Sequence, residues 1–248
     1  MDAPSTQARY AALDALPARA RACLEGVPRL HYQNFAATWR DEHRFLKVQP
    51  RGGVPSLRQE AERIEWLDGQ LRVPRVVALD HDDTSEWMCT EALPGVDATR
   101  LEGDPEQTVA IFARGLRRFH DALDPASCPF RFTQDIALAH IQARGTPGPS
   151  ATRAFEDLLR TRPPERDLVV CHGDYCFPNV LIEDGHVTAY LDLGEVGVAG
   201  RWFDLAIATA TCTWNLGPGY EGVFLRHYGA AMDPEQRDWY RQLYELVS

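Results

Sequence analysis

Four polar residues stand out within the stretch VVCHGDYCFPNVLIEDGHVTAYLDLG, residues 169–194: His172, Asp174, Asn179 and Asp192. The segments around them are apolar and typical of short buried strands, where an unpaired polar group is costly. The Asp184-Gly185 pair predicts a β-hairpin, whose two flanks bring Asn179 and Asp192 together. Because an amide oxygen beside a carboxylate suits Mg²⁺, we predict these two residues as Mg²⁺ ligands.

Asp174 is expected beside this metal site, where its carboxylate can accept the proton of an incoming hydroxyl group. A carboxylate base next to an Asn/Asp pair on a metal is the arrangement that transfers a phosphoryl group from a nucleotide. The order His-x-Asp-x-x-x-x-Asn, followed by Asp-x-Gly, is also that of protein kinases. Gly173 replaces the arginine of that pattern, which indicates a small-molecule kinase instead of a protein kinase.

A lysine and a glutamate in the first part of the chain complete this chemistry. Lys47 lies in RFLKV, an expected strand, and Glu60 follows thirteen residues later on an expected helix. Ser56 and Gln59 predict a capping box at the start of that helix, and Glu60 then borders its buried side. A Lys–Glu pair of this kind holds the lysine against the α- and β-phosphates of ATP.

Each of these residues also has a purely structural interpretation. Asp174 alone would suit a cap, Asn179 a turn and Lys47 a solvated strand end. Their joint order on suitable elements favours the chemical interpretation. His172, in contrast, is expected to be a buried structural histidine that hydrogen-bonds to the backbone.

The six cysteines form no Cys-x-x-Cys pair, and a chain of 248 residues does not need disulfides for stability. Free thiols in a reducing cytoplasm are therefore expected. Cys171 and Cys176 flank the polar motif, but neighbours on a strand point to opposite faces, so Cys171 and His172 do not form a nucleophile–base pair. Neither cysteine catalysis nor a Cys/His metal site is predicted.

The expected elements divide into two groups. Strands with one helix come first, and a mostly helical part that carries the hairpin follows, with helices expected over 104–123, over 151–161 and from 201 onward. Residues 1–26 read as an Ala-rich amphipathic helix broken near Pro17, and PGVDAT marks a boundary. This pattern predicts an α+β fold with an N-terminal nucleotide-binding lobe, 1–92, and a C-terminal catalytic and substrate-binding lobe, 93–248.

The charge and the apolar content of the chain limit the classes of partner that it can bind. The net charge of −10 argues against nucleic acid and against an anionic membrane surface, because both attract Lys/Arg patches. It is compatible with a cationic small-molecule substrate. The sequence contains no run of 18 apolar residues and its N-terminus lacks the apolar stretch of a signal peptide, so a cytoplasmic protein is expected. We also expect a monomer or a weak dimer.

The segment HGDYCFPNVLIEDGHVTAYLDLGEVGVAGRWFDLA resembles the core of the aminoglycoside 3'-phosphotransferases, within the antibiotic and choline kinase superfamily. GLRRFHDALDPASCPF, VPRVVAL, TEALPG and the C-terminal FLRHYG…DWYRQLYELVS resemble further parts of that family, from about Lys47 onward. The resemblance implies a two-lobed protein-kinase-like fold. It also implies that ATP, with Mg²⁺, phosphorylates the 3'-hydroxyl of an aminoglycoside such as kanamycin.

Residue by residue, the resemblance implies that Asp174 is the catalytic base and that Asn179 and Asp192 bind Mg²⁺. Lys47 and Glu60 become the phosphate lysine and its partner. The resemblance further implies backbone contacts of adenine with Thr90–Ala92, with Cys89 at the back of that pocket, and a catalytic loop held by Asp204.

Departures from the family pattern concern mainly the acceptor. Trp214 and Asn215 stand where carboxylates for the drug's ammonium groups are expected, and Glu195 replaces an expected arginine. The chain ends in ELVS without the family's aromatic terminus. Since a polycation needs carboxylate partners, the candidate substrate residues, besides Asp174, are Glu156, Asp157 and Glu245.

Two alternatives remain open at this point. The acceptor could be another hydroxylated antibiotic or a metabolite, which the missing acidic positions favour. Alternatively, the protein could bind nucleotide with little catalysis, an interpretation supported by Glu195 and by the lack of serine in RLHYQNFAATWR. The intact Lys47, Asp174, Asn179 and Asp192 argue against this second alternative.

Overall fold

The computed structural model describes residues 10–33, 36–144 and 148–247. The chain divides into two compact units, Met1–Pro94 and Gly95–Ser248. The predicted boundary, after residue 92, lies two residues before the observed one, after Pro94. The assignment of nucleotide binding to the first unit and of catalysis to the second remains a prediction.

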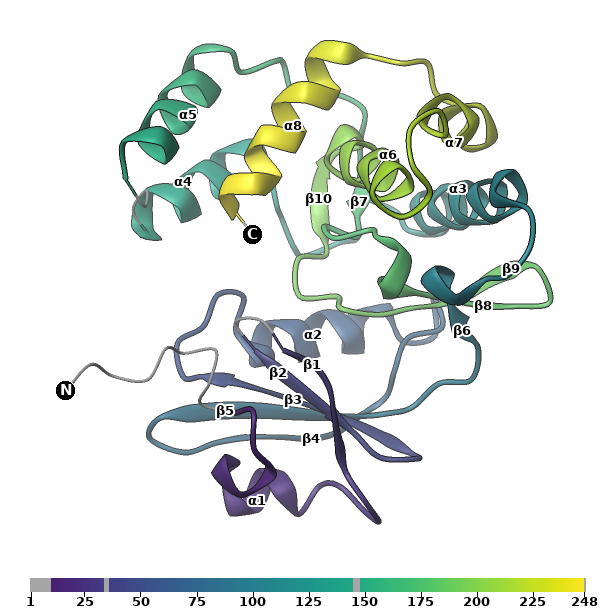
Figure 1. Cartoon of the computed structure of the whole chain (residues 1–248). Coiled ribbons are helices and arrows are strands. Elements are labelled where there is room, and N and C mark those ends of the chain that lie inside the picture. The colour runs from purple at the N-terminus through teal and green to yellow at the C-terminus, as the bar shows by residue number, and fades with distance from the viewer. Residues whose placement is uncertain (1–9, 34–35, 145–147, 248) are drawn as a thin grey trace. The chain divides into compact units, whose positions relative to one another are not determined.

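The N-terminal unit contains an antiparallel sheet of five strands in the order β1-β2-β3-β5-β4 (Figure 1). Helix α2 (Leu57–Leu67) lies against β4 and β5 and begins with the predicted capping box, in which Ser56 and Gln59 each accept a hydrogen bond from the other's backbone N–H. The strands are β1 (Arg29–Gln33), β2 (Ala37–Arg40), β3 (Arg44–Pro50), β4 (Val76–His81) and β5 (Ser85–Glu91).

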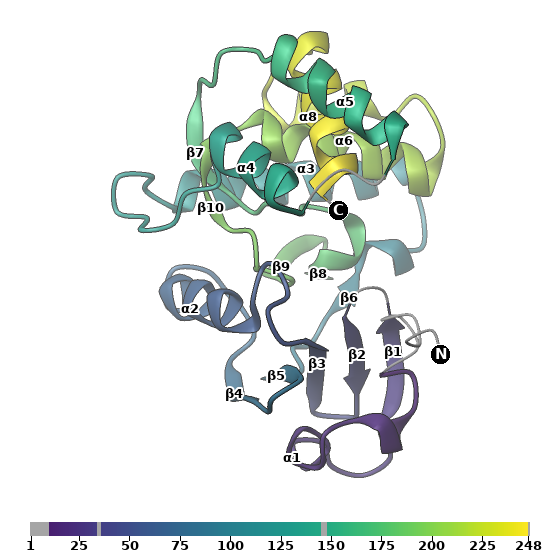
Figure 2. The same cartoon turned by 90° about the vertical axis from the view of Figure 1, so that its left-hand side faces the viewer.

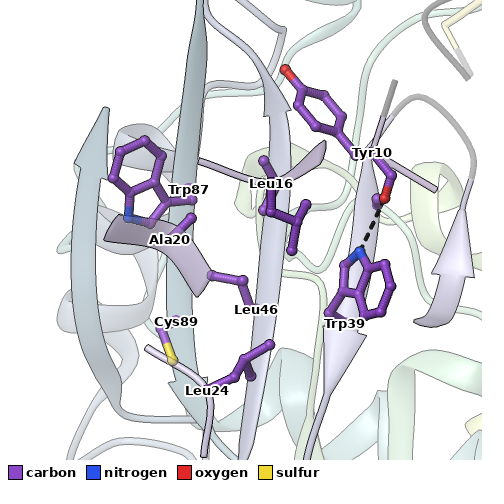
Figure 3. Packing of buried hydrophobic residues seen from close by; sticks show 10 residues of the cluster. Tyr10, Leu16, Ala20, Leu24, Trp39, Leu46, Trp87 and Cys89 are labelled. Atoms are coloured by element: carbon purple, nitrogen blue, oxygen red, sulfur yellow. Dashed lines mark hydrogen bonds between the residues drawn. The ribbon is translucent and has the colours of Figure 1, made fainter. Parts of the chain in front are cut away.

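A hydrophobic cluster covers the sheet face opposite α2 (Figure 3). Alternate residues of neighbouring strands supply it, because side chains one residue apart on a strand point to opposite faces. The sheet register pairs Leu46 of β3 with Cys89 of β5. The cluster's remaining core members are Tyr10, Leu16, Ala20, Leu24, Ala37, Trp39, Val48 and Trp87.

The segment before β1 differs from the expected amphipathic helix. In its described part it forms a 3-10 turn at Leu13–Ala15 and the four-residue helix α1 (Ala18–Arg21), separated at the expected break near Pro17. Packing on the sheet replaces helix continuity here: Leu16 and Ala20 enter the cluster, and Trp39 Nε1 donates a hydrogen bond to the Tyr10 carbonyl (3.0 Å; Figure 3).

The C-terminal unit combines helices with two small sheets. Strands β7 (Leu168–Cys171) and β10 (Gly197–Gly200) pair antiparallel, and β6 (Val96–Asp97), β8 (Val180–Glu183) and β9 (His186–Tyr190) form the other sheet. The predicted hairpin is confirmed: Asp184 and Gly185 have φ values of 50° and 73°, as a tight hairpin turn requires. The helices of this unit are α3 (Pro105–Ala122), α4 (Gln134–Arg144), α5 (Pro149–Arg160), α6 (Trp202–Leu216), α7 (Glu221–Tyr228) and α8 (Pro234–Val247).

Helix α3 positions the hairpin. Its predicted apolar stripe, which includes Phe112, is buried. Gly115 interrupts this stripe, and a Cβ added there would lie 2.4 Å from Val187 of β9, so only glycine allows this approach. Two tyrosine hydroxyl groups then fix the hairpin region to α3: Tyr175 donates to the Phe112 carbonyl and Tyr190 to the Gly115 carbonyl, both at 2.9 Å.

Helix α6 is buried along its first eleven residues, Trp202–Cys212, and lies against α3, α7 and α8. A helix that is apolar on all sides is characteristic of the centre of a domain. Among the helices that the structure describes, none is long and apolar enough to span a membrane.

Candidate active site

The chain segment after β7 brings Asp174 and Asn179 into contact. A short 3-10 turn, Phe177–Asn179, follows Asp174 and leads into β8. The Asn179 amide donates through Nδ2 to the backbone oxygen of Asp174 (3.0 Å) and to its Oδ2 (2.8 Å). The amide is thereby oriented, and its Oδ1 accepts no hydrogen bond from any residue that the structure describes.

Asp192 lies on the opposite flank of the hairpin. Its neighbour Leu191 donates its backbone N–H to the carbonyl of Asn179 (2.9 Å), so the two flanks meet as predicted. Asp192 has φ of 56°, in the left-handed region that residues with a Cβ rarely adopt.

The loop of residues 172–179, which follows β7, holds Asp174 close enough to Asp192 for the two carboxylates to influence each other. Burial raises the pKa of Asp174, and the nearby charge of Asp192 raises it further, while His172, Tyr244 and Asn179 oppose the shift. Two carboxylates that disfavour each other's charge attract a cation. The carboxylate of Asp192 and the oriented amide oxygen of Asn179 are hard oxygen donors of the kind that Mg²⁺ prefers, so this pair fits the ion.

A buried network holds the other side of the loop. Asp204 is fully buried and accepts hydrogen bonds from the backbone N–H groups of His172 (2.7 Å) and Gly173 (2.8 Å). Its Oδ2 also lies 2.9 Å from His120 Nε2, and the other ring nitrogen of His120 lies 2.7 Å from the Tyr228 hydroxyl. The implied role of Asp204 in holding the loop is confirmed by these contacts.

His172 and Gly173 are also explained by packing. His172 is fully buried, burial lowers its pKa, and its Nδ1 accepts the N–H of Asp174 (3.3 Å), so it is the structural histidine that was predicted. Gly173 has φ of 93°, and a Cβ there would lie 2.4 Å from Cβ of Glu195. Glycine replaces arginine at this position because the Glu195 backbone occupies the space of a side chain.

The cysteines near the loop are poor nucleophiles. Burial raises the pKa of both Cys171 and Cys176, so the thiol forms are favoured. Ligand atoms of His120, Cys171 and Asp204 lie within 4.8 Å of one another. However, the imidazole and the carboxylate of this group already hydrogen-bond to each other and to the backbone, so the contacts account for them without a metal.

Lys47 and Glu60 form the expected ion pair within the N-terminal unit. Lys47 Nζ lies 2.9 Å from Glu60 Oε2, and the Glu60 side chain is only 5% exposed. Lys47 lies between two cluster residues of β3, Leu46 and Val48, and therefore points to the sheet face that α2 covers. Lysine and helix glutamate thus share one side of the sheet.

The placement of Cys89 at the back of an adenine pocket is wrong. Strand alternation puts Cys89 in the hydrophobic cluster, on the face opposite Lys47, whereas Met88 is the residue of β5 paired with Lys47. Thr90 lies in β5 and pairs with Phe45. Ala92 follows this strand, and its N–H donates to the His43 carbonyl (2.7 Å); the adenine contacts of Thr90–Ala92 remain a prediction.

The candidate substrate residues are solvent-exposed. Glu156 and Asp157 lie on α5, where Asp157 pairs with Arg160 (2.8 Å), and Glu245 is exposed near the end of α8. No hydrogen bond or ion pair between described residues joins these three to Asp174. Instead, the neighbour of Glu245 reaches the loop: the Tyr244 hydroxyl donates to Asp174 Oδ1 (3.0 Å). The sequence contained no local signal for this contact, since the residues are 70 positions apart.

Comparisons with known proteins show the family of this chain. Residues 28–242 match the model of the phosphotransferase enzyme family. The chain is 37% identical to the aminoglycoside 3'-phosphotransferase of Streptomyces fradiae, with 82% of this chain and 85% of that protein covered. It is 35% identical to the streptomycin 3''-kinase of Streptomyces griseus, with 84% and 86% covered.

The fold is also shared with a solved structure, the aminoglycoside phosphotransferase APH(3'')-Id of Streptomyces rimosus. The TM-score is 0.77 at 26% identity, over 89% of this chain and 92% of that one. The same enzyme in complex with ADP and streptomycin gives a TM-score of 0.69 at 25% identity, over 86% and 90%. The predicted α+β, kinase-like fold is thereby confirmed, and the chain belongs to the phosphotransferase enzyme family.

Proposed function

We propose that this phosphotransferase transfers the γ-phosphate of ATP to a hydroxyl group of an aminoglycoside, with the 3'-hydroxyl as the leading acceptor. The observation that carries this proposal is the contact between Asp174 and Asn179, beside Asp192. Asp204 stabilises their loop by accepting hydrogen bonds from its backbone. The names of the related enzymes support the substrate class.

Asp174 is the proposed general base. Its carboxylate accepts the proton of the acceptor hydroxyl as the oxygen–phosphorus bond forms and the bond to the leaving ADP oxygen breaks. General bases of this kind contribute about 10²- to 10⁴-fold to a rate. Because each carboxylate oxygen has two lone pairs, the hydrogen bonds from Asn179 and Tyr244 leave acceptor capacity for this proton.

Asn179 and Asp192 are the proposed Mg²⁺ ligands. When bound, Mg²⁺ neutralises negative charge on the phosphate groups. For the nucleotide itself, we propose Lys47, oriented by Glu60, as the phosphate contact and the backbone of Thr90–Ala92 as the adenine contact.

The acceptor is proposed to be a cation held by carboxylates, of which Glu156, Asp157 and Glu245 are the candidates. The net charge of −10 supports a cationic partner over nucleic acid. All six cysteines are free thiols, which suits the reducing cytoplasm. A monomer or weak dimer is expected, and sedimentation would measure it.

A second acceptor, the 3''-hydroxyl of a streptomycin-like drug, has support of its own. The identity to the streptomycin kinase is only two percentage points below that to the 3'-enzyme, 35% against 37%. In addition, Trp214 and Asn215 replace acidic residues that were expected for the 3'-substrates.

One experiment separates these possibilities. Purified protein is mixed with ATP, Mg²⁺ and, in separate reactions, kanamycin, a 3'-deoxy analogue or streptomycin, and ADP release is measured with and without EDTA. Turnover of kanamycin but not of the 3'-deoxy drug supports the 3'-acceptor, whereas turnover of streptomycin alone supports the 3''-acceptor. Asp174→Ala serves as the inactive control. Failure to phosphorylate any aminoglycoside would overturn the substrate class.

A further inference from the structure

The last helix of the described chain contacts the catalytic loop directly. Tyr244, on α8, donates its hydroxyl hydrogen to Asp174 Oδ1 (3.0 Å). Asn179 donates to the other carboxylate oxygen, Oδ2 (2.8 Å). Each oxygen of the proposed base therefore has its own donor. One donor lies five residues away in the same loop, and the other lies 70 residues away in the sequence.

Helix α8 is itself firmly anchored. On one side it packs against α5, where Trp239 Nε1 donates to the Leu158 carbonyl (2.9 Å) and Gln242 Nε2 to the Ala154 carbonyl (3.2 Å). On the other it packs against α6, where Arg241 donates to Thr209 Oγ1 (3.0 Å). Both views show α8 between these helices (Figures 1 and 2). Tyr244 therefore extends from an element whose rotation and register are fixed.

A tryptophan supports the tyrosine ring. Trp214 of α6 lies with its ring centroid 6.4 Å from that of Tyr244, at an interplanar angle of 33°. This separation lies within the range of about 4.5–7 Å in which aromatic pairs attract each other. Trp214 remains 63% exposed, so the pair lies at the protein surface while the Tyr244 hydroxyl points to Asp174.

A carboxylate rotates with little hindrance about its last side-chain bond. The direction of its lone pairs matters for proton acceptance, and a misplacement of about 1 Å costs up to about 100-fold in rate. We propose that Tyr244 is a positioning residue for the reaction: its hydroxyl fixes the Asp174 carboxylate in the orientation that accepts the substrate proton. This inference rests on the proposed function of Asp174.

The test compares two tyrosine-to-phenylalanine variants of the same helix. Tyr244→Phe removes the hydroxyl that contacts Asp174 and keeps the ring against Trp214. Tyr240→Phe, one helical turn earlier, removes a hydroxyl that accepts a hydrogen bond from Gln134 Nε2 (3.0 Å). This bond joins α8 to α4 and includes no residue of the catalytic loop. Steady-state phosphorylation of the best aminoglycoside and the melting temperature are measured for both variants and for the unmodified protein.

We expect Tyr244→Phe to lower kcat about 10- to 100-fold, with KM for ATP and the melting temperature nearly unchanged. Tyr240→Phe should lower the melting temperature and leave kcat within about twofold of the unmodified enzyme, because a purely structural bond acts on stability. An unchanged kcat in Tyr244→Phe would overturn the inference. A lower kcat accompanied by a clearly lower melting temperature would also overturn it, because the loss of activity would then follow from a loss of stability. If the unmodified protein phosphorylates no aminoglycoside, the proposed function fails instead.

Discussion

Two aspartates hold opposite sides of one loop, and their surroundings differ. Asp204 is fully buried, and its carboxylate receives two backbone N–H groups and an imidazole. Asp174 accepts hydrogen bonds from two side chains. Burial raises its pKa most, and the nearby negative charge of Asp192 raises it further. One carboxylate is satisfied by the fold, whereas the other retains a preference for a proton or a cation.

The difference indicates which aspartate serves stability and which serves chemistry. A buried carboxylate with a full set of donors favours the folded state. A carboxylate whose charge is disfavoured by its surroundings is typical of an active site, where stability is exchanged for reactivity. Substitutions on the two sides of the loop should therefore separate activity from stability.

The largest effect is expected on the chemical side. Asp174→Asn should lower turnover by about 10³-fold, because the amide cannot accept the substrate proton. The melting temperature of the ligand-free protein should stay equal or rise, since the replaced carboxylate was disfavoured by burial and by Asp192. ADP release and thermal denaturation measure the two quantities. More than a tenth of the original turnover would refute the role of Asp174 as base.

The opposite result is expected for the other aspartate. Asp204→Ala leaves the N–H groups of His172 and Gly173 and the His120 ring without their shared acceptor. Each buried donor left without an acceptor costs about 1–3 kcal/mol of unfolding free energy. Urea denaturation measures this loss. A variant as stable as the original protein would show that the network does not hold the loop.

A smaller, pH-dependent effect is expected from His172. Burial keeps its pKa below the ordinary value, so the unfolded chain binds a proton at a higher pH than the folded protein does. Stability from this residue is present above about pH 6.5 and falls as the pH drops below it, by at most about 1.4 kcal/mol per pH unit. His172→Asn, which keeps an acceptor for the Asp174 N–H, should flatten the dependence of unfolding free energy on pH between 7.5 and 5.5. An identical pH dependence in both proteins would contradict this assignment.

The parts of the fold that the sequence predicted well depend on local signals. The Asp184-Gly185 turn and the Ser56–Gln59 capping box are formed by neighbouring residues, so short-range chemistry suffices to recognise them. Asp174 was likewise predicted to lie beside Asn179 and Asp192, and its contact with Asn179 spans only five residues. The Lys47–Glu60 pair required only one strand and one helix in addition.

The missed features depend on tertiary contacts. Strand β10 reads Gly-Val-Ala-Gly, which has no strand pattern, and it exists because it pairs with β7. Helix α4 was overlooked between its flanking loops, although Ala137, Leu138 and Ile141 lie at helical spacing. The face of Cys89 followed from sheet alternation, and the contact of Tyr244 with Asp174 from the packing of α8.

The close approach of Gly173 to Glu195 limits how this loop can evolve. Any side chain at position 173 would collide with the backbone of residue 195 as well as with its Cβ, 2.4 Å away. A single substitution therefore cannot introduce an arginine there; the segment at 195 would have to move first. A substitution of Glu195 alone would not open this space, because its backbone oxygen and carbon would still lie 2.8 Å and 2.9 Å from the added Cβ. An arginine-bearing loop of the protein-kinase type therefore requires the backbone of both segments to move together.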